Sequence, residues 1–292
     1  MSFRPDSSVE LPSGGLVCNA HHLRICGICT VDYNFMDDMT DHADEPVSGL
    51  ESSQGPAAII NPNLDGPPPG PTAESGRFFP TPFKPPQTTD TPQSLFVPGM
   101  NYKATPPVHR FINRTDSSQF LIYTDGACLN NGQVNPRAGC SFVFKPASTH
   151  EVVAHVAMRL EKKGPTGERH PQTSNRAELR AALAALRFRF WPGEGFDTLV
   201  IATDSAYMVN GATSWIRGWA RNGWKTSAGA SVKNRDLWEC LIDEAERFHH
   251  YGMKVRFWRI PRECNTQADR RAKEAAAEPE REEYREMLGA LV

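Results

Sequence analysis

The pattern of hydrophobic positions changes near residue 117, and after it apolar residues recur with the periods of strands and helices. Continuous or alternating apolar runs predict strands at 120–124, 140–144, 151–159, 198–203 and 253–260, with a turn rich in Asn and Gly at 126–132. Apolar residues at helical spacing predict helices at 174–191, 236–251 and 266–277. This order of elements describes an α/β fold with a five-stranded mixed sheet flanked by helices.

The chain before residue 116 is rich in proline and poor in aliphatic residues. It holds 17 of the 24 prolines, with a dense stretch from Pro56 to Pro98. Because such a segment forms few regular backbone hydrogen bonds and has little to bury, we interpret 45–115 as a disordered linker. Phe78, Phe79 and Phe83 are then either a short docking motif or scattered aromatic residues of a flexible tether. On this interpretation residues 1–110 are dispensable for chemistry, and a fragment beginning near Asn113 folds.

The formal net charge of −2 hides a division along the chain. Residues 1–115 hold 7 Lys and Arg against 12 Asp and Glu, residues 116–277 hold 23 against 17, and residues 278–292 hold 2 against 5. An acidic arm, a basic body at 116–278 and an acidic C-terminal tail at 279–292 indicate that the body alone meets a polyanion.

Apolar windows and cysteines restrict the class of protein further. No stretch approaches about 18 consecutive apolar residues, which argues against a membrane partner. The first ten residues have neither an apolar secretory core nor the composition of a mitochondrial transit peptide. Seven cysteines spread over 292 residues do not form a disulfide framework, so we expect a reducing compartment, the nucleus or the cytoplasm.

Acidic residues occur beside or within apolar segments, where a carboxylate is costly. Asp125 and Asp204 each follow a predicted strand, Glu178 lies one turn into an apolar helix, and Asp269 lies early in the last helix. Carboxylates from separate elements that converge at one edge of a sheet repel one another and are stable together mainly around a hard divalent cation. Taken singly, Asp204 is equally an N-cap, and Asp269 is a favourable first-turn acid on the helix dipole.

Several motifs occur in an order that resembles the type 1 ribonuclease H family. Tyr123-Thr-Asp-Gly-Ala-Cys128 is similar to its opening motif, Thr173-Ser-Asn-Arg-Ala-Glu-Leu179 to its second, and Ala202-Thr-Asp-Ser205 to its third. Residues 215–238 resemble the basic protrusion and following helix of cellular members, and Ala268-Asp269 fits the fourth motif. The resemblance covers about 117–277 and leaves the N-terminal extension unmatched.

The resemblance implies a ribonuclease H-like fold and an enzyme that hydrolyses the RNA strand of RNA–DNA hybrids, leaving 5′-phosphate and 3′-hydroxyl ends. The family's catalytic, metal-binding acids fall on Asp125, Glu178, Asp204 and Asp269. Two Mg2+ ions are the implied cofactor, with Mn2+ able to substitute. Oxygen ligands suit Mg2+, and two metal ions together activate the attacking water and stabilise the leaving oxyanion. The implied partner is an RNA–DNA hybrid, and we expect the chain to act as a monomer.

The resemblance also implies contacts with both strands of the hybrid near the acids. Asn131, Ser174 and Asn175 match positions that contact RNA 2′-hydroxyls or bases in the minor groove, a role for which small polar side chains are suited. Thr173 and Asn234 match a pocket for a phosphate of the DNA strand.

The protrusion supplies a second expected surface. Trp219, Trp224 and Lys225 are expected to hold the DNA strand by stacking and phosphate contact. For Trp215 and Trp238, packing in the core is the favoured interpretation. The loop at 261–267 lacks the histidine that bacterial and animal members carry before the last acid, which puts the turnover rate in doubt more than the identity.

Cysteines and histidines cluster in the N-terminal segment 1–44. Cys18 and His21 form a CxxH pair, and Cys26 and Cys29 form a CxxC pair, at the spacing of zinc ligands. This segment is either a compact zinc knuckle or a thiol-bearing segment that docks a protein partner without metal.

A function from another class stays open at this point: a ribonuclease H fold that binds nucleic acid or protein and cleaves weakly or not at all. Four intact acids favour the enzyme. The short loop without histidine and the thinly charged protrusion favour the binding module.

Overall fold

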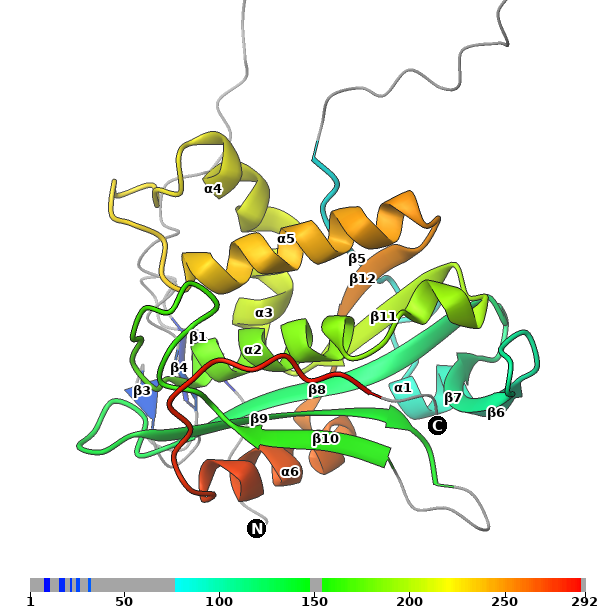
Figure 1. Ribbon diagram of the computed structural model, residues 1–292, viewed down its shortest axis with the longest axis horizontal. Coiled ribbons are helices and arrows are strands. Elements are labelled where there is room, and N and C mark those ends of the chain that lie inside the picture. The colour runs from blue at the N-terminus through cyan, green and yellow to red at the C-terminus, as the bar shows by residue number, and fades with distance from the viewer. Residues whose placement is uncertain are drawn as a thin grey trace, which may run out of the picture.

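The main part of the molecule is built on one eight-stranded sheet (Figure 1). The computed structural model describes residues 77–147 and 154–289, together with four short strands and His22 near the N-terminus. The strands of the sheet are β5 (Thr81–Pro82), β6 (Phe96–Asn101), β7 (Val108–Asn113), β8 (Gln119–Leu129), β9 (Arg137–Lys145), β10 (Ala154–Arg159), β11 (Thr198–Thr203) and β12 (Lys254–Arg259). The helices are α1 (Pro92–Leu95), α2 (Ser174–Arg187), α3 (Ala206–Asn210), α4 (Ile216–Arg221), α5 (Arg235–His250) and α6 (Thr266–Ala276).

The sheet is mixed, as the sequence predicts. β8, β9 and β10 form an antiparallel meander, whereas β11 pairs parallel with β8 and β12 pairs parallel with β11. The five predicted strands therefore form the predicted α/β sheet. Three further strands extend it: β5 pairs parallel with β12, and the β6–β7 hairpin joins through β7 to the start of β8.

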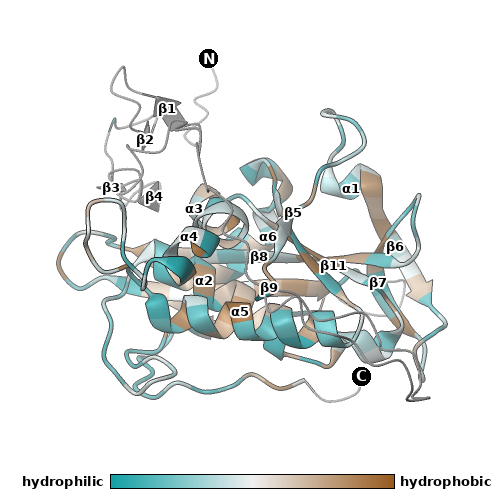
Figure 2. Cartoon of the chain, turned by 90° about the horizontal axis from the view of Figure 1, so that it is seen from above, coloured by the Kyte–Doolittle hydropathy of each residue, from teal (hydrophilic) through white to brown (hydrophobic). Residues whose placement is uncertain are grey.

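Helices cover both faces of the sheet, and the alternation of side chains along β8 explains why its sequence is continuously apolar. Phe120 and Ile122 enter the larger core with α2 and α5, whereas Leu121 and Tyr123 enter a second cluster on the opposite face, where α6 packs. A strand buried on both faces loses the alternating pattern of a half-exposed strand. Figure 2 shows the polar residues of α5 on its surface and apolar residues along β11 beneath it.

β8 is longer than the sequence predicts. The predicted turn at 126–132 is wrong for its first residues, because the strand continues to Leu129 and pairs with β9 as far as Arg137. Asp125 consequently lies in the middle of a strand, opposite Ser141, and not at the end of one.

The predicted linker is also wrong for residues 77–113, which belong to the folded body. Phe83, Leu95 and Phe96 are buried in the second cluster, where the ring of Phe83 lies 5.0 Å from that of Trp258. The apolar residues scattered among the prolines therefore cover part of a sheet face that α6 leaves open. Proline is tolerated there because β5 is an edge strand. The rest of the predicted linker, 45–76, lies outside the described residues.

The acidic tail packs against the body. Its carboxylates pair with basic residues: Glu280 with Lys162 at 2.5 Å, Glu283 with Lys163 at 2.6 Å, and Glu286 with Arg187 at 2.5 Å. The tail thus covers positive charge of the body itself. Within the described part of the chain, none of the helices is both long enough and apolar enough to span a membrane.

Near the N-terminus, β1 (Ser8–Glu10) pairs with β2 (Leu16–Cys18), and β3 (Ile25–Cys26) pairs with β4 (Val31–Asp32), both antiparallel. Of the four predicted zinc ligands, Cys18 and Cys26 end β2 and β3. His21 and Cys29 lie outside the described residues.

Candidate active site

Four carboxylates from four different elements converge near the middle of β8 and the end of β11. Asp125 comes from the middle of β8, Glu178 from the second turn of α2, Asp204 from the residue after β11, and Asp269 from the first turn of α6. Their charges act on one another: those of Asp204 and Asp269 raise the pKa of Asp125. The structure therefore brings together all four acids that the sequence singled out.

Gly126 allows β8 and α2 to approach closely enough to bring the first two acids together. A Cβ atom at this position would lie 2.1 Å from the backbone N of Glu178 and 2.3 Å from the backbone carbon of Ala177. Such contacts are impossible for any residue with a side chain. The glycine after Asp125 is thus part of the construction of the site.

Asp125 and Glu178 form a buried pair. Asp125 is 4% exposed and Glu178 is 8% exposed, and their carboxyl groups are hydrogen-bonded to each other. Burial, followed by the charges of neighbouring acids, raises the pKa of both groups well above the usual range. Two carboxyl groups held this way favour sharing a proton or a cation over carrying two free charges.

Asp204 is held by Asn265, a residue that the sequence analysis did not single out. The side-chain Nδ2 of Asn265 donates to Oδ1 of Asp204 at 2.7 Å and to the backbone O of Thr124 at 3.0 Å. Asn265 is 1% exposed. It therefore ties the loop before α6 both to an acid of the site and to the strand that carries Asp125.

Asp269 is held by two basic side chains. Nη2 of Arg262 donates to its Oδ1 at 2.8 Å, and Nζ of Lys273 donates to its Oδ2 at 2.9 Å. Nε of Arg262 also lies 4.0 Å from Oδ2 of Asp204. Arg262 thus places a positive charge between two of the four acids, which the sequence did not reveal because the residue lies on an irregular loop.

The donor set suits a hard divalent cation, although the side chains are not yet arranged around one. Carboxylate oxygens that repel one another in a buried site are ligands of the kind that Mg2+ prefers. Among the residues that the structure describes, no three acidic, histidine or cysteine side chains are grouped as metal ligands. Asp269 instead bonds through its two oxygens to Arg262 and Lys273, so binding a cation there requires it to exchange these partners, whereas Asn265 bonds to Asp204 through Oδ1 alone.

Most of the predicted minor-groove and phosphate residues gather at the start of α2. Thr173 caps the helix by accepting a hydrogen bond from the backbone N of Arg176. Nδ2 of Asn131 donates to Oγ of Ser174 at 3.1 Å, and both residues are buried. Asn175 is half-buried beside them. Their contacts with nucleic acid stay predictions.

Asn234 is joined to this group through Arg176, which also forms a buried ion pair with Asp236. Its Oδ1 accepts from Nη1 of Arg176 at 3.2 Å, and the same guanidinium makes two bonds to Asp236, at 2.9 and 2.7 Å. Asn234 adopts a positive φ of 59°, a conformation that asparagine tolerates better than most residues.

The protrusion differs from its expected form at Trp224. This side chain is 6% exposed and belongs to the larger core, so it does not present a face to a base, and the stacking expected of it is wrong. Trp219 is half-buried against Trp215 and Trp238, whereas Lys225 is exposed. Trp238 is fully buried and donates from Nε1 to the hydroxyl of Tyr207, as its predicted core role requires.

A mixed sheet flanked by helices, with four acids gathered from β8, α2, α6 and the end of β11, defines an α/β protein of the ribonuclease H-like class. The family model described as RNase H matches residues 117–277. The chain belongs to the ribonuclease H family, and its domain is of type 1.

Relatives match different shares of the chain. Ribonuclease H1 of Homo sapiens is 35% identical over 179 residues, which are 60% of this chain and 56% of the human protein. Ribonuclease H of Cereibacter sphaeroides is 42% identical over 132 residues, 45% of this chain and 78% of the bacterial one. A crystal structure of LC9-RNase H1, a type 1 RNase H with the type 2 active-site motif, is 26% identical at a TM-score of 0.38, covering 54% of this chain and 72% of that one. The chain thus spans just over half the length of the human relative.

Proposed function

We propose that this protein hydrolyses the RNA strand of RNA–DNA hybrids, leaving 5′-phosphate and 3′-hydroxyl ends. The observation that carries the proposal is the convergence of Asp125, Glu178, Asp204 and Asp269 in a member of the ribonuclease H family. The relatives named ribonuclease H and ribonuclease H1 support the same reaction.

The four acids would hold two Mg2+ ions, for which Mn2+ can substitute. When bound, the ions supply activation of the attacking water and stabilisation of the leaving oxyanion. The protein's own residues prepare the site: Asn265 orients Asp204, and Arg262 balances the charge of Asp204 and Asp269 until the cations arrive.

Incubation of the purified protein with an end-labelled hybrid, with and without Mg2+, tests the proposal. Asp125→Asn and Asp204→Asn should each abolish cleavage while leaving hybrid binding largely intact. Asp243→Asn is the matched control, because Asp243 is exposed and pairs with Arg77 away from the site. Undiminished cleavage in either site variant removes that residue from the mechanism. Hybrid binding by the unaltered protein without any Mg2+-dependent cleavage would favour the binding module instead.

We also propose that the N-terminal segment binds one Zn2+ through Cys18, His21, Cys26 and Cys29. The placement of Cys18 and Cys26 at the ends of two strands of neighbouring hairpins supports this proposal. The full-length protein substituted with Co2+ should show a thiolate-to-metal absorption band that weakens as the pH falls, because the ligands must be deprotonated. Absence of this band would favour the metal-free docking segment.

A further inference from the structure

The segment that precedes the domain matched by the family model touches the loop that carries Arg262 and Asn265 of the site. Nε2 of Gln93, in α1, donates to the backbone O of Cys264 at 2.9 Å across 171 residues of sequence. Cys264 is followed directly by Asn265, which binds Asp204, and the chain then enters α6 with Asp269. The contact therefore falls on the peptide directly before Asn265, the residue that holds Asp204.

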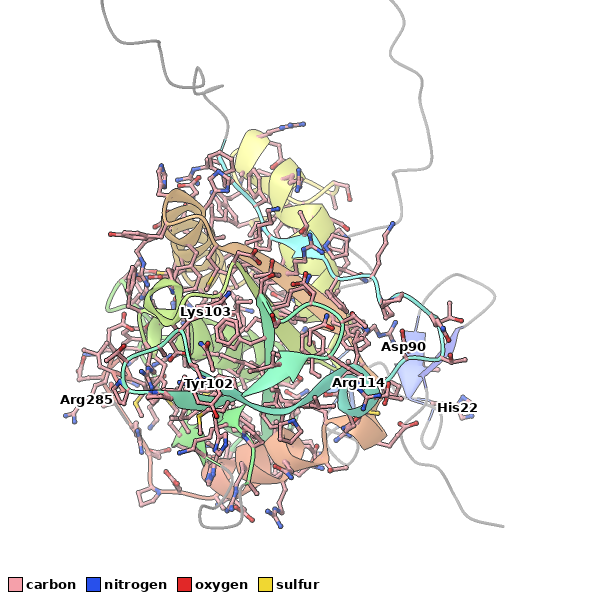
Figure 3. All side chains as sticks on the ribbon, turned by 90° about the vertical axis from the view of Figure 1, so that its right-hand side faces the viewer. His22, Asp90, Tyr102, Lys103, Arg114 and Arg285 are labelled. Carbon is pink, nitrogen blue, oxygen red and sulfur yellow. The ribbon has the colours of Figure 1, made fainter. Side chains whose placement is uncertain are left out.

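α1 is anchored firmly enough to act as a fixed point. Thr91 and Ser94 form a reciprocal capping box at its start, and the side chain of Leu95, its last residue, is buried. The backbone O of Leu95 accepts a hydrogen bond from the backbone N of Arg114 at 2.8 Å, which ties the helix to the end of β7. In Figure 3, Asp90, just before α1, and Arg114 lie on the same side of the molecule.

The loop itself has little regular structure to hold it in place. It is one short 3-10 turn, Arg262–Cys264, between β12 and α6. Its side chains are partly exposed except for that of Asn265, and Cys264 packs on the cluster that includes Phe83, Leu95 and Phe96. These three residues lie outside the range that the family model matches, so the extension supplies much of the apolar surface on which Cys264 packs.

We propose that residues 77–113 are a positioning element of the active site and that Gln93 is its positioning residue. By holding the peptide at Cys264, Gln93 keeps Asn265 where it bridges Asp204 and the backbone of Thr124. Asp204 is then already oriented to bind a cation before the substrate binds. This inference rests on the proposed function for its catalytic consequence, but not for its effect on the binding of metal alone.

The full-length Gln93→Met variant tests the proposal, since methionine has similar length, carries no charge and cannot donate a hydrogen bond. Mg2+ alone should bind roughly fivefold more weakly by calorimetry, a change of the size expected from one lost hydrogen bond. The kcat for a labelled hybrid at a fixed, subsaturating Mg2+ concentration should fall by a similar factor, with the KM for hybrid unchanged.

Gln87→Met is the matched control, because Gln87 lies on the same segment with an exposed side chain. Equal Mg2+ affinity and kcat in Gln93→Met and Gln87→Met would overturn the proposal. So would a loss that simply follows a fall in melting temperature. If the unaltered protein bound Mg2+ but did not cleave hybrid, the proposed function would fail, while the comparison of Mg2+ affinities would still decide the role of Gln93.

Discussion

Arg262 and the acids around it show how single side chains set the readiness of the site for metal. Its guanidinium bonds to Asp269 and approaches Asp204. Its positive charge therefore interacts with two of the carboxylates that a bound cation would also contact. Lys273 adds a second positive charge at Asp269. These two positive charges offset part of the negative charge of the acids, and a metal ion has to compete with them.

Replacing Arg262 by glutamine should strengthen the binding of Mg2+. The variant loses a partly exposed ion pair worth up to about 1 kcal/mol, so the Kd for Mg2+ should fall roughly two- to fivefold. Calorimetry of the protein with Mg2+ and no substrate measures this. Arg270→Gln, on the outer side of α6, makes the same change in charge and should leave the Kd unaltered. Weaker binding in Arg262→Gln would show that the arginine supports the metal site and does not compete with the metal.

Elements meet at the site through backbone contacts that a larger residue would prevent. Gly126→Ala should separate β8 from α2, because the new Cβ would overlap the backbone of Ala177 and Glu178. We expect a loss of at least about 2 kcal/mol in the free energy of unfolding, with loss of cleavage. Gly218→Ala in α4 is the control: its Cβ meets nothing within 4 Å, so the helix should gain about 0.5–1 kcal/mol. A stable, active Gly126→Ala protein would mean that the two elements can move apart without harm.

In the protrusion, the neighbouring residues Trp224 and Lys225 differ in burial: the first lies in the core and the second is exposed. Trp224→Ala should lower the free energy of unfolding by about 3–5 kcal/mol, because it empties a buried site. Lys225→Ala should leave stability unchanged but weaken hybrid binding and reduce its salt dependence by about one counterion. Thermal melting and binding at several salt concentrations, on both variants, measure the difference. Weak binding with full stability in Trp224→Ala would restore its role in stacking.

The sequence predicts well those elements whose buried residues form a long apolar run or a full apolar helix face. β11 at 198–203 appears as predicted, and α2 and α6 begin as predicted, because each buries a continuous run or a full helical face. The acids could be found because carboxylates in such segments are costly. Asn265 and Gln93 could not, because their partners lie on a loop or far away in sequence. The extension was missed because its few apolar residues are spread among prolines, and only the open face of the sheet gives them a place.

At the scale of the whole molecule, the folded body is larger than the domain that the family model matches, because the segments before and after that domain in sequence pack against it. Arg110, in β7, is fully buried and makes two bonds to Glu194, at 2.8 and 2.6 Å. On the C-terminal side of the domain, Arg180 is buried beneath Tyr284 of the acidic tail and bonds to Glu161 at 2.8 Å. Removing one partner of a buried ion pair leaves a charge without compensation, which is strongly destabilising.

These contacts reverse the expectation that a fragment beginning near Asn113 folds. Such a fragment lacks Arg110 and exposes the sheet face that Phe83 and Phe96 cover. The loss of several kcal/mol approaches the whole stability of an ordinary domain, about 5–15 kcal/mol, so the fragment should unfold or aggregate. A fragment beginning at Arg77 keeps every one of these contacts and should melt cooperatively and cleave hybrid like the full chain. Circular dichroism melting and cleavage assays on the two fragments decide the matter. A stable and fully active fragment from Asn113 would show that the extension is an addition to the enzyme and no part of its core.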